Sequence, residues 1–120
     1  MNKLHKLIFL LLLAVSCDDI LVHDLSKDTV TPRTPAEGYE GTRDQAVIFW
    51  WEELDGATEY ELVVASPDIT NPQVLALDTV LTKTQISITT IPVGTYQWCV
   101  RGINSNYKTD FACRGFSVKE

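Results

Sequence analysis

Hydrophobic and polar residues alternate with a period of two along much of the chain after residue 28. The clearest case is Glu59 to Ala65, in which Tyr60, Leu62 and Val64 share one face. Ala46 to Trp51 is apolar throughout, and period two places Val47, Phe49 and Trp51 together on one face. Period two is the side-chain repeat of a β-strand that buries one face. Both segments are therefore predicted to be strands.

Turn signals such as Asp55-Gly56 and Val93-Gly94 separate further segments of the same kind. The additional strands are expected at 29–31, 74–79, 85–91, 95–103 and 111–118. The first should be an edge strand ended by Pro32 and Pro35, because proline cannot donate to a strand ladder. No helical period occurs after the N-terminal segment. The pattern predicts an all-β fold, a seven-stranded two-sheet sandwich with Trp51, Tyr60, Tyr96 and Trp98 in its core.

The first sixteen residues have a different pattern, with Lys3 and Lys6 ahead of an unbroken apolar run from Leu7 to Val15. This run is too short to span a bilayer, which takes about 20 residues, and fits the core of a signal peptide. The following Ala14-Val15-Ser16-Cys17 resembles a bacterial lipobox, although that family prefers leucine at the place of Ala14. The resemblance implies that residues 1–16, a signal helix, are removed and that Cys17 carries a lipid anchor in a membrane. The alternative is an ordinary secretory signal with an unrelated cysteine.

Residues 17–28 are acidic and lack periodicity, so they are predicted to be a flexible tether ahead of a domain at 29–120. Asp18 and Asp19 directly follow the cysteine. Such a cluster resembles the surface-export signal of lipoproteins from Bacteroidota-type bacteria, whereas in other Gram-negative bacteria Asp at this place resembles an inner-membrane retention signal. We expect the outer membrane and the cell surface, with the periplasmic face as the alternative.

Two motifs of the predicted domain carry a family resemblance. Trp51, Gly56-Ala57 and the Tyr60-x-Leu62-x-Val64 pattern resemble the second and third strands of a fibronectin type III domain, an immunoglobulin-like sandwich. The stretch Gly94 to Asn104 resembles its sixth strand, with Tyr96 at the place of the family's tyrosine corner. Similar domains recur in SusE/SusF-like outer-membrane lipoproteins of polysaccharide-utilisation systems. The resemblance implies a fold and a setting, and it implies no active site.

With Cys17 acylated, Cys99 and Cys113 remain as a pair. If Asn106 lies at the tip of the last hairpin, the two cysteines face each other across neighbouring strands, near the separation that a disulfide needs. We therefore predict a structural disulfide. A metal or redox site is the alternative, but the chain has no Cys-x-x-Cys motif and no histidine near these cysteines.

Composition argues against nucleic acid and against catalysis. The net charge of −6 repels phosphate backbones, so no nucleic-acid partner is expected. His5 would leave with the signal peptide and His23 lies in the tether, so a Ser-His-Asp triad has no histidine in the folded domain. No cluster of zinc ligands occurs, and we expect no metal, no cofactor and no catalytic residue.

Two groups of acidic and amide residues are candidate sites. Glu52-Glu53 or Glu59 with Glu61 could form a glycosidase pair, but Glu59 and Glu61 alternate with core residues and should lie on a solvated sheet face. The second group could flank a calcium loop, but its spacing matches no ordered ligand pattern; its members are Asp68, Asn71 and Asp78.

Binding is indicated by two aromatic residues. Trp50 alternates with Trp51 and should point outward beside Ile48, where its indole can stack on a sugar ring or cover an apolar patch of a partner; alternatively, residues 28–41 shield it. Tyr107 is the second candidate, in the last hairpin loop. The leading hypothesis is a lipid-anchored, non-enzymatic binding or scaffold module for a glycan or an envelope protein. The alternatives are a structural spacer, or the front of a longer lipoprotein, and an enzyme is the least favoured class.

Overall fold

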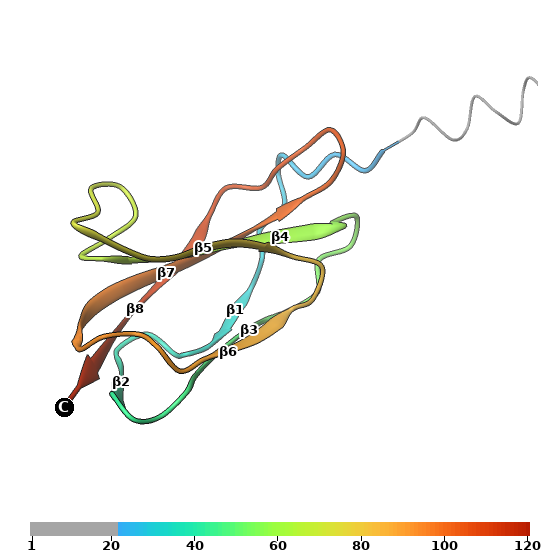
Figure 1. Cartoon of the computed structure of the whole chain (residues 1–120). Coiled ribbons are helices and arrows are strands. Elements are labelled where there is room, and N and C mark those ends of the chain that lie inside the picture. Colours follow the sequence, from blue (N-terminus) through green and yellow to red (C-terminus); the bar gives the residue numbers. More distant parts are fainter. Residues whose placement is uncertain (1–21) are drawn as a thin grey trace, which may run out of the picture.

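The computed structural model describes residues 22–120, so the predicted signal peptide and Cys17 lie outside the described residues. Two β-sheets pack face to face around one core (Figure 1). The strands in chain order are β1 (Pro32–Thr34), β2 (Tyr39–Thr42), β3 (Val47–Trp51), β4 (Glu59–Ser66), β5 (Val74–Leu81), β6 (Gln85–Ile88), β7 (Gly94–Ile103) and β8 (Ala112–Lys119). From residue 22 onward there is no helix with the length and apolarity that crossing a membrane requires.

The all-β sandwich is confirmed, with eight strands in place of the expected seven. The three-stranded sheet has the order β1-β3-β6, and the five-stranded sheet has the order β2-β8-β7-β4-β5. Neighbouring strands are antiparallel except for β2 and β8, which run parallel. The central strands β4 and β7 pair residue for residue from Glu59↔Ile103 to Ala65↔Gln97.

The core lies between the sheets and contains all four predicted aromatic residues. Trp51 and Trp98 are fully buried, and the Phe49 ring meets the Trp98 ring edge to face at 5.4 Å. The Tyr96 hydroxyl donates to the carbonyl oxygen of Pro92 at 2.8 Å, as expected for a tyrosine corner. The alternation read from β3, β4 and β7 therefore identifies the buried faces correctly.

The first strand lies later than predicted. Residues 29–31 form no strand, and β1 begins at Pro32, which pairs with Trp51. Val30 is buried nonetheless, and the carbonyl oxygen of Thr31 accepts a hydrogen bond from the amide of Glu52. Proline is tolerated at the first residue of an edge strand because no ladder donor is needed there. Pro32 thus begins the strand that it was expected to end.

Strand β2 is the additional element. Its four residues, Tyr39 to Thr42, contain one glycine and three exposed side chains, so they show no alternation that the sequence could reveal. The strand forms because its backbone reaches the free edge of β8, where Tyr39 pairs with Phe116 and Thr42 with Lys119. β2 thereby covers one edge of the five-stranded sheet.

The described part of the predicted tether packs against the sandwich. Leu25 is fully buried, and the amide of Asp28 donates to its carbonyl oxygen at 3.0 Å in a turn. Residues 22–28 lie beside the loop between β7 and β8 (Figure 1). The packing therefore begins several residues before the domain start expected at residue 29. A single leucine among polar residues carries no periodic signal, which explains the difference.

Candidate binding site

Two apolar side chains project from the outer face of the three-stranded sheet. Along β3 buried and exposed residues alternate, so that Ile48 and Trp50 point outward while their neighbours enter the core. Trp50 is 42% exposed and Ile48 is 49% exposed. The expected outward direction of Trp50 is thus observed, and residues 28–41 leave the indole accessible.

Trp50 lines a shallow, mainly apolar groove of about 500 Å³. Pro35, Ala36 and Tyr39, from the β1–β2 connection and the start of β2, form one wall. Gln85 of β6 contributes an amide on the other side of Trp50, with which it is paired across the sheet. The Tyr39 ring is 38% exposed, so the groove presents two aromatic surfaces. Tyr39 was not identified from the sequence because the strand that carries it has no pattern.

The wall of this groove is fixed to the core. The Trp98 indole Nε1–H donates to the carbonyl oxygen of Pro35 at 3.0 Å, and both groups are buried. The Thr34 hydroxyl donates to the carbonyl oxygen of Ile48 at 2.9 Å, which joins the wall to the floor. Binding pockets that are already formed lose little conformational entropy when they are filled. The groove is therefore suited to recognition by stacking and apolar contact, with the Gln85 amide and the Thr34 hydroxyl as its polar side chains.

Tyr107 lies elsewhere and does not line the groove. It is half-buried in the β7–β8 loop, where the Asn104 side chain accepts a hydrogen bond from its amide at 2.8 Å. The Tyr107 carbonyl oxygen in turn accepts from the amide of Asn104. The structure thus separates the two aromatic candidates and gives the Tyr107 backbone a role in shaping the loop.

Cys99 and Cys113 form the predicted disulfide. They are directly opposite each other in the β7–β8 ladder, with Cα atoms 4.1 Å apart. The bond lies on the outer face of the five-stranded sheet, opposite in direction to the core residues Trp98 and Val100. Its position across two neighbouring strands gives it a structural role.

A charged cluster on the same outer face was not anticipated. Glu61 was expected to be solvated, but its side chain is only 17% exposed. Arg101, its partner across β4 and β7, donates to the Glu61 carboxylate through Nε at 2.8 Å and Nη2 at 2.6 Å. The Arg101 guanidinium also lies over the Phe111 ring, 4.4 Å from its centre. The sequence alone does not reveal that Glu61 lies opposite Arg101, because this depends on the register between β4 and β7.

Asp78 of β5 completes the cluster and shares a hydrogen bond with Glu61. Desolvation, together with the hydrogen bond and negative charge of Glu61, raises the pKa of Asp78 above its ordinary value. Desolvation also acts to raise the pKa of Glu61, but hydrogen bonds from Arg101 and Asp78 outweigh it and leave that pKa below its ordinary value. Cross-strand pairs of opposite charge stabilise a sheet, and ion-pair networks that serve structure also shift pKa values, so this partly buried cluster is assigned a structural role.

Two of the other acidic candidates have partners, and the first is Glu52, which accepts a hydrogen bond from Arg33 at 2.6 Å. Asp68 accepts from the amides of Thr70 and Asn71 at 3.0 and 2.8 Å, which is an Asx turn in the β4–β5 loop. His23 pairs with Asp28 at 3.0 Å on the surface. In residues 22–120 no three metal-binding side chains of His, Cys, Asp or Glu come together as a cation site.

No protein-family model matches the sequence, and no curated protein matches it. Several solved structures are similar in fold. The structure of FN3tt is 16% identical with a TM-score of 0.54, covering 75% of this chain and 95% of that chain. The fn3 domain of the human collagen alpha-1(XX) chain is 12% identical with a TM-score of 0.55, covering 79% of this chain and 90% of that chain. A fibronectin(III)-like module of CbhA from Clostridium thermocellum is 14% identical with a TM-score of 0.52, covering 76% and 96%.

The described domain therefore has a fibronectin type III-like fold, as the Trp51 to Val64 and Gly94 to Asn104 motifs indicated. Identities this low show the fold alone. The exposed aromatic groove is the candidate site on this fold.

Proposed function

We propose that this protein is a lipid-anchored envelope protein that binds a glycan, without catalysis, through the Trp50 groove. The observation that carries the proposal is the exposed indole of Trp50 beside the Tyr39 ring, on a wall pinned to the core by Trp98. Sugar rings present apolar C–H faces that stack on indole and phenol rings. The Gln85 amide offers a donor and an acceptor for a hydroxyl group at the edge of such a stack.

A glycan array with Trp50→Ala tests the groove. Loss of a stacked, half-exposed indole at the centre of a binding site costs about 1.4–3 kcal/mol, which is about a 10- to 150-fold weaker affinity. Tyr107→Ala is the matched control, because Tyr107 is outside the groove, and it should leave the affinity unchanged. Equal loss in both variants would contradict a site confined to the groove, and loss in Tyr107→Ala alone would place the site in the β7–β8 loop.

A protein ligand is the second candidate, since an apolar groove bordered by aromatic residues also suits an apolar anchor of a partner. Capture of envelope proteins by the immobilised domain, again compared with Trp50→Ala, distinguishes this case. If the domain retains neither glycans nor envelope proteins, it is a structural spacer, or the front module of a longer lipoprotein.

Anchorage is proposed through a lipid on Cys17, with the outer membrane and its outer face as the location. The support is the lipobox-like Ala14 to Cys17 and the acidic Asp18-Asp19 that follow it. Acyl chains contribute about 0.8 kcal/mol for each buried CH₂ group, so two or more chains hold a protein stably. Cys17→Ala should move the protein from the membrane to the soluble fraction. Proteolysis of intact cells should degrade the unmodified protein if it faces outward and spare it if it faces the periplasm.

A further inference from the structure

The segment that follows the proposed lipid site is fastened to one end of the sandwich. The Asn104 Nδ2 group of the β7–β8 loop donates to the carbonyl oxygen of His23 at 2.7 Å and to that of Gly56 at 3.1 Å. One side-chain amide thus joins the N-terminal segment, the β3–β4 turn and the β7–β8 loop. Together with the buried Leu25, this contact fixes where the chain enters the domain.

The fit around this contact is close. Gly56 has a φ of +88°, and a Cβ atom added to it would lie 2.6 Å from the His23 ring. The ring is also held by Asp28, at 3.0 Å, and Asp24 accepts from the amide of Ser26 at 2.8 Å. Residues 22–28 are therefore part of the folded body. We call the end formed by them, Gly56 and Asn104 the entry pole.

Cys17 lies six residues before His23. A chain spans at most about 3.6 Å per residue, so the sulfur of Cys17 can be no more than about 20–25 Å from the entry pole, whatever conformation the intervening residues adopt. Strand β7 runs ten residues from one end of the sandwich to the other, which is about 33 Å at the usual rise. The maximum reach of the residues between Cys17 and His23 is therefore shorter than the length of the domain.

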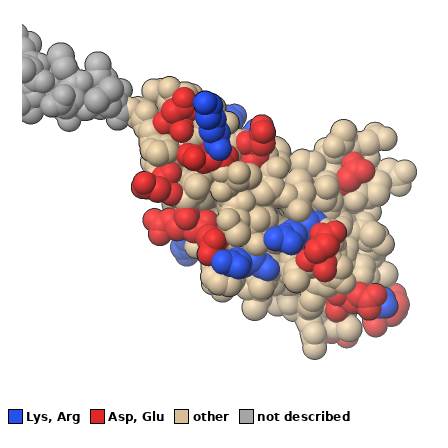
Figure 2. All heavy atoms as spheres, turned by 180° about the vertical axis from the view of Figure 1, so that it is seen from behind, with Lys and Arg blue, Asp and Glu red and all other residues tan. Residues whose placement is uncertain are grey.

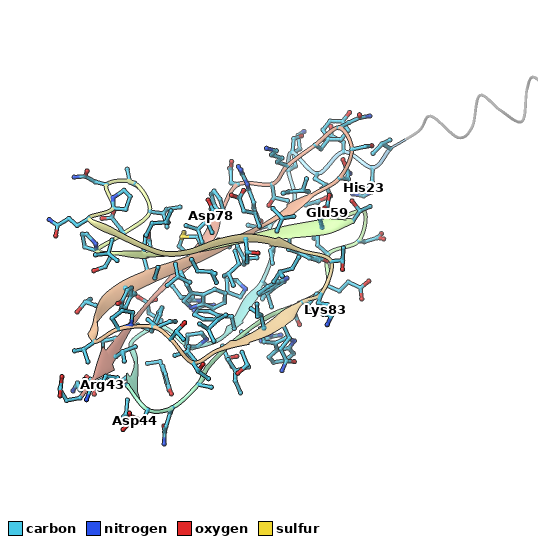
Figure 3. All side chains as sticks on the ribbon, in the orientation of Figure 1. His23, Arg43, Asp44, Glu59, Asp78 and Lys83 are labelled. Carbon is cyan, nitrogen blue, oxygen red and sulfur yellow. A yellow bond between two sulfur atoms is a disulfide. The ribbon has the colours of Figure 1, made fainter. Side chains whose placement is uncertain are left out.

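We infer that the entry pole faces the membrane and that the opposite pole, with Arg43 and Asp44 in the β2–β3 turn, points away from it. This inference rests on the lipid anchor at Cys17 proposed above. His23 and Glu59 lie at one end of the molecule, while Arg43 and Asp44 lie at the other (Figure 3).

Charge does not set this orientation. Acidic side chains, with basic ones among them, lie on the end where the described chain begins (Figure 2). An anionic membrane surface repels carboxylates over about a Debye length, so the short tether must hold this end toward the membrane. The groove lies on a side of the sandwich, and Tyr39 and Ala46 line it toward the far pole. In this orientation a ligand reaches the groove from the solution.

Energy transfer from the domain to labelled lipids tests the orientation. Asp55 and Asp44 are a matched pair, because both are exposed aspartates in turns, one at each pole. The lipidated full chain carries a maleimide donor dye at Asp55→Cys or at Asp44→Cys in phosphatidylcholine vesicles with an acceptor dye on the headgroups. The native disulfide and the acylated Cys17 do not react with the dye.

A label that is about 30 Å closer to the acceptors should show at least about twofold higher transfer. Equal transfer, or higher transfer from position 44, would overturn the orientation.

Two further measurements separate this inference from the anchor itself. If the lipidated chain does not float with the vesicles, or if Cys17→Ala floats equally well, the proposed anchor fails and the orientation fails with it. If the chain floats and the two labels are equivalent, the anchor stands and only the orientation fails.

Insertion of 20 Gly/Ser residues after Asp19 should remove most of the difference in energy transfer between the two labels, because such a linker spans about 25 Å on average and allows the domain to turn over. A difference that persists with the insert would show that the fastened N-terminal segment does not set the orientation.

Discussion

The two buried tryptophans differ at the level of a single atom. Trp98 Nε1–H donates to Pro35, whereas Trp51 Nε1 finds no acceptor among the described residues. Replacing a bonded indole by a phenyl ring leaves the Pro35 carbonyl oxygen buried without a partner, while the same change at Trp51 removes a donor that was unpaired. A buried unpaired group costs about 1–3 kcal/mol. Loss of the indole should therefore lower the stability of the fold more at Trp98 than at Trp51, although both side chains are fully buried.

We expect Trp98→Phe to lower the free energy of unfolding by about 1–3 kcal/mol more than Trp51→Phe does. Urea denaturation of the two variants measures this difference. Because Pro35 belongs to the wall of the groove, Trp98→Phe should also weaken ligand binding, and Trp51→Phe should not. Equal stability losses would show that the indole hydrogen bond contributes nothing.

Asp78 provides a prediction that depends on pH. Its pKa is raised in the folded state by desolvation and by Glu61, so the carboxyl group ionises more readily in the unfolded chain. Ionisation of Asp78 therefore destabilises the fold as the pH rises through the folded pKa. Asp78→Asn keeps a hydrogen-bond donor to Glu61 and removes the charge.

This variant should be more stable than the parent at pH 7, by up to about 1 kcal/mol because the group is exposed and screened by solvent. The gain should shrink as the pH falls toward about 4 and vanish below about pH 3, where Asp78 is protonated in both states. Thermal melts at several pH values measure it. The opposite trend, with a gain only in acid, would contradict the raised pKa.

At the scale of the elements, two glycines with positive φ form a matched pair. Gly38, at φ +80°, has no atom within 4 Å of an added Cβ, whereas at Gly56 that atom would lie against the His23 ring. Gly38→Ala should cost only the backbone penalty of about 1 kcal/mol. Gly56→Ala should cost the same and also displace residues 22–28. Hydrogen exchange should accelerate in that segment for Gly56→Ala alone; acceleration in both variants, or in neither, would contradict the close fit at the entry pole.

The disulfide joins β7 to β8 near the hairpin end of their ladder. Closing a loop of about 15 residues stabilises a protein by about 3 kcal/mol on the chain-entropy account. A Cys99→Ala, Cys113→Ala double variant should lose about that much in urea denaturation, while its Trp50 groove keeps its affinity. Free thiols in the oxidised native protein would contradict the bond.

The elements also show how much the sequence can predict. β3 and β4 were identified because one face of each is buried, and the alternation follows directly. The cysteines could be paired because a hairpin fixes its own register. β2 and the Leu25 contact were missed because both depend on surfaces made by distant parts of the chain. For the same reason the sequence indicated Trp50 but not Tyr39, and Glu61 but not its pairing with Arg101.

At the scale of the whole molecule, the five-stranded sheet has a long open edge at β5. β5 is the last strand of the five-stranded sheet and has a partner on one side only. Val74, Leu75 and Val80 on this eight-residue strand are about half exposed. Long, apolar and unpaired edges promote pairing with other chains, and natural proteins often protect them with lysine or proline. β5 contains neither residue, and Asp78 is its only charge.

The orientation inferred above bears on this edge. β4 leaves the entry pole and β5 returns toward it, so β5 runs between the two poles. Antiparallel pairing of two β5 edges would place the entry poles of the two copies at opposite ends, so both copies could not keep the entry pole toward one membrane. Anchored copies that hold the inferred orientation are therefore protected against the more stable mode of edge pairing. We expect the mature chain with Cys17→Ala, free in solution, to self-associate at high concentration in sedimentation velocity. Leu75→Lys should abolish this association, while Val93→Lys, a change at another exposed apolar residue away from the edge, should not. Association that survives Leu75→Lys would mean that copies meet through another surface, with the Trp50 groove the first to test.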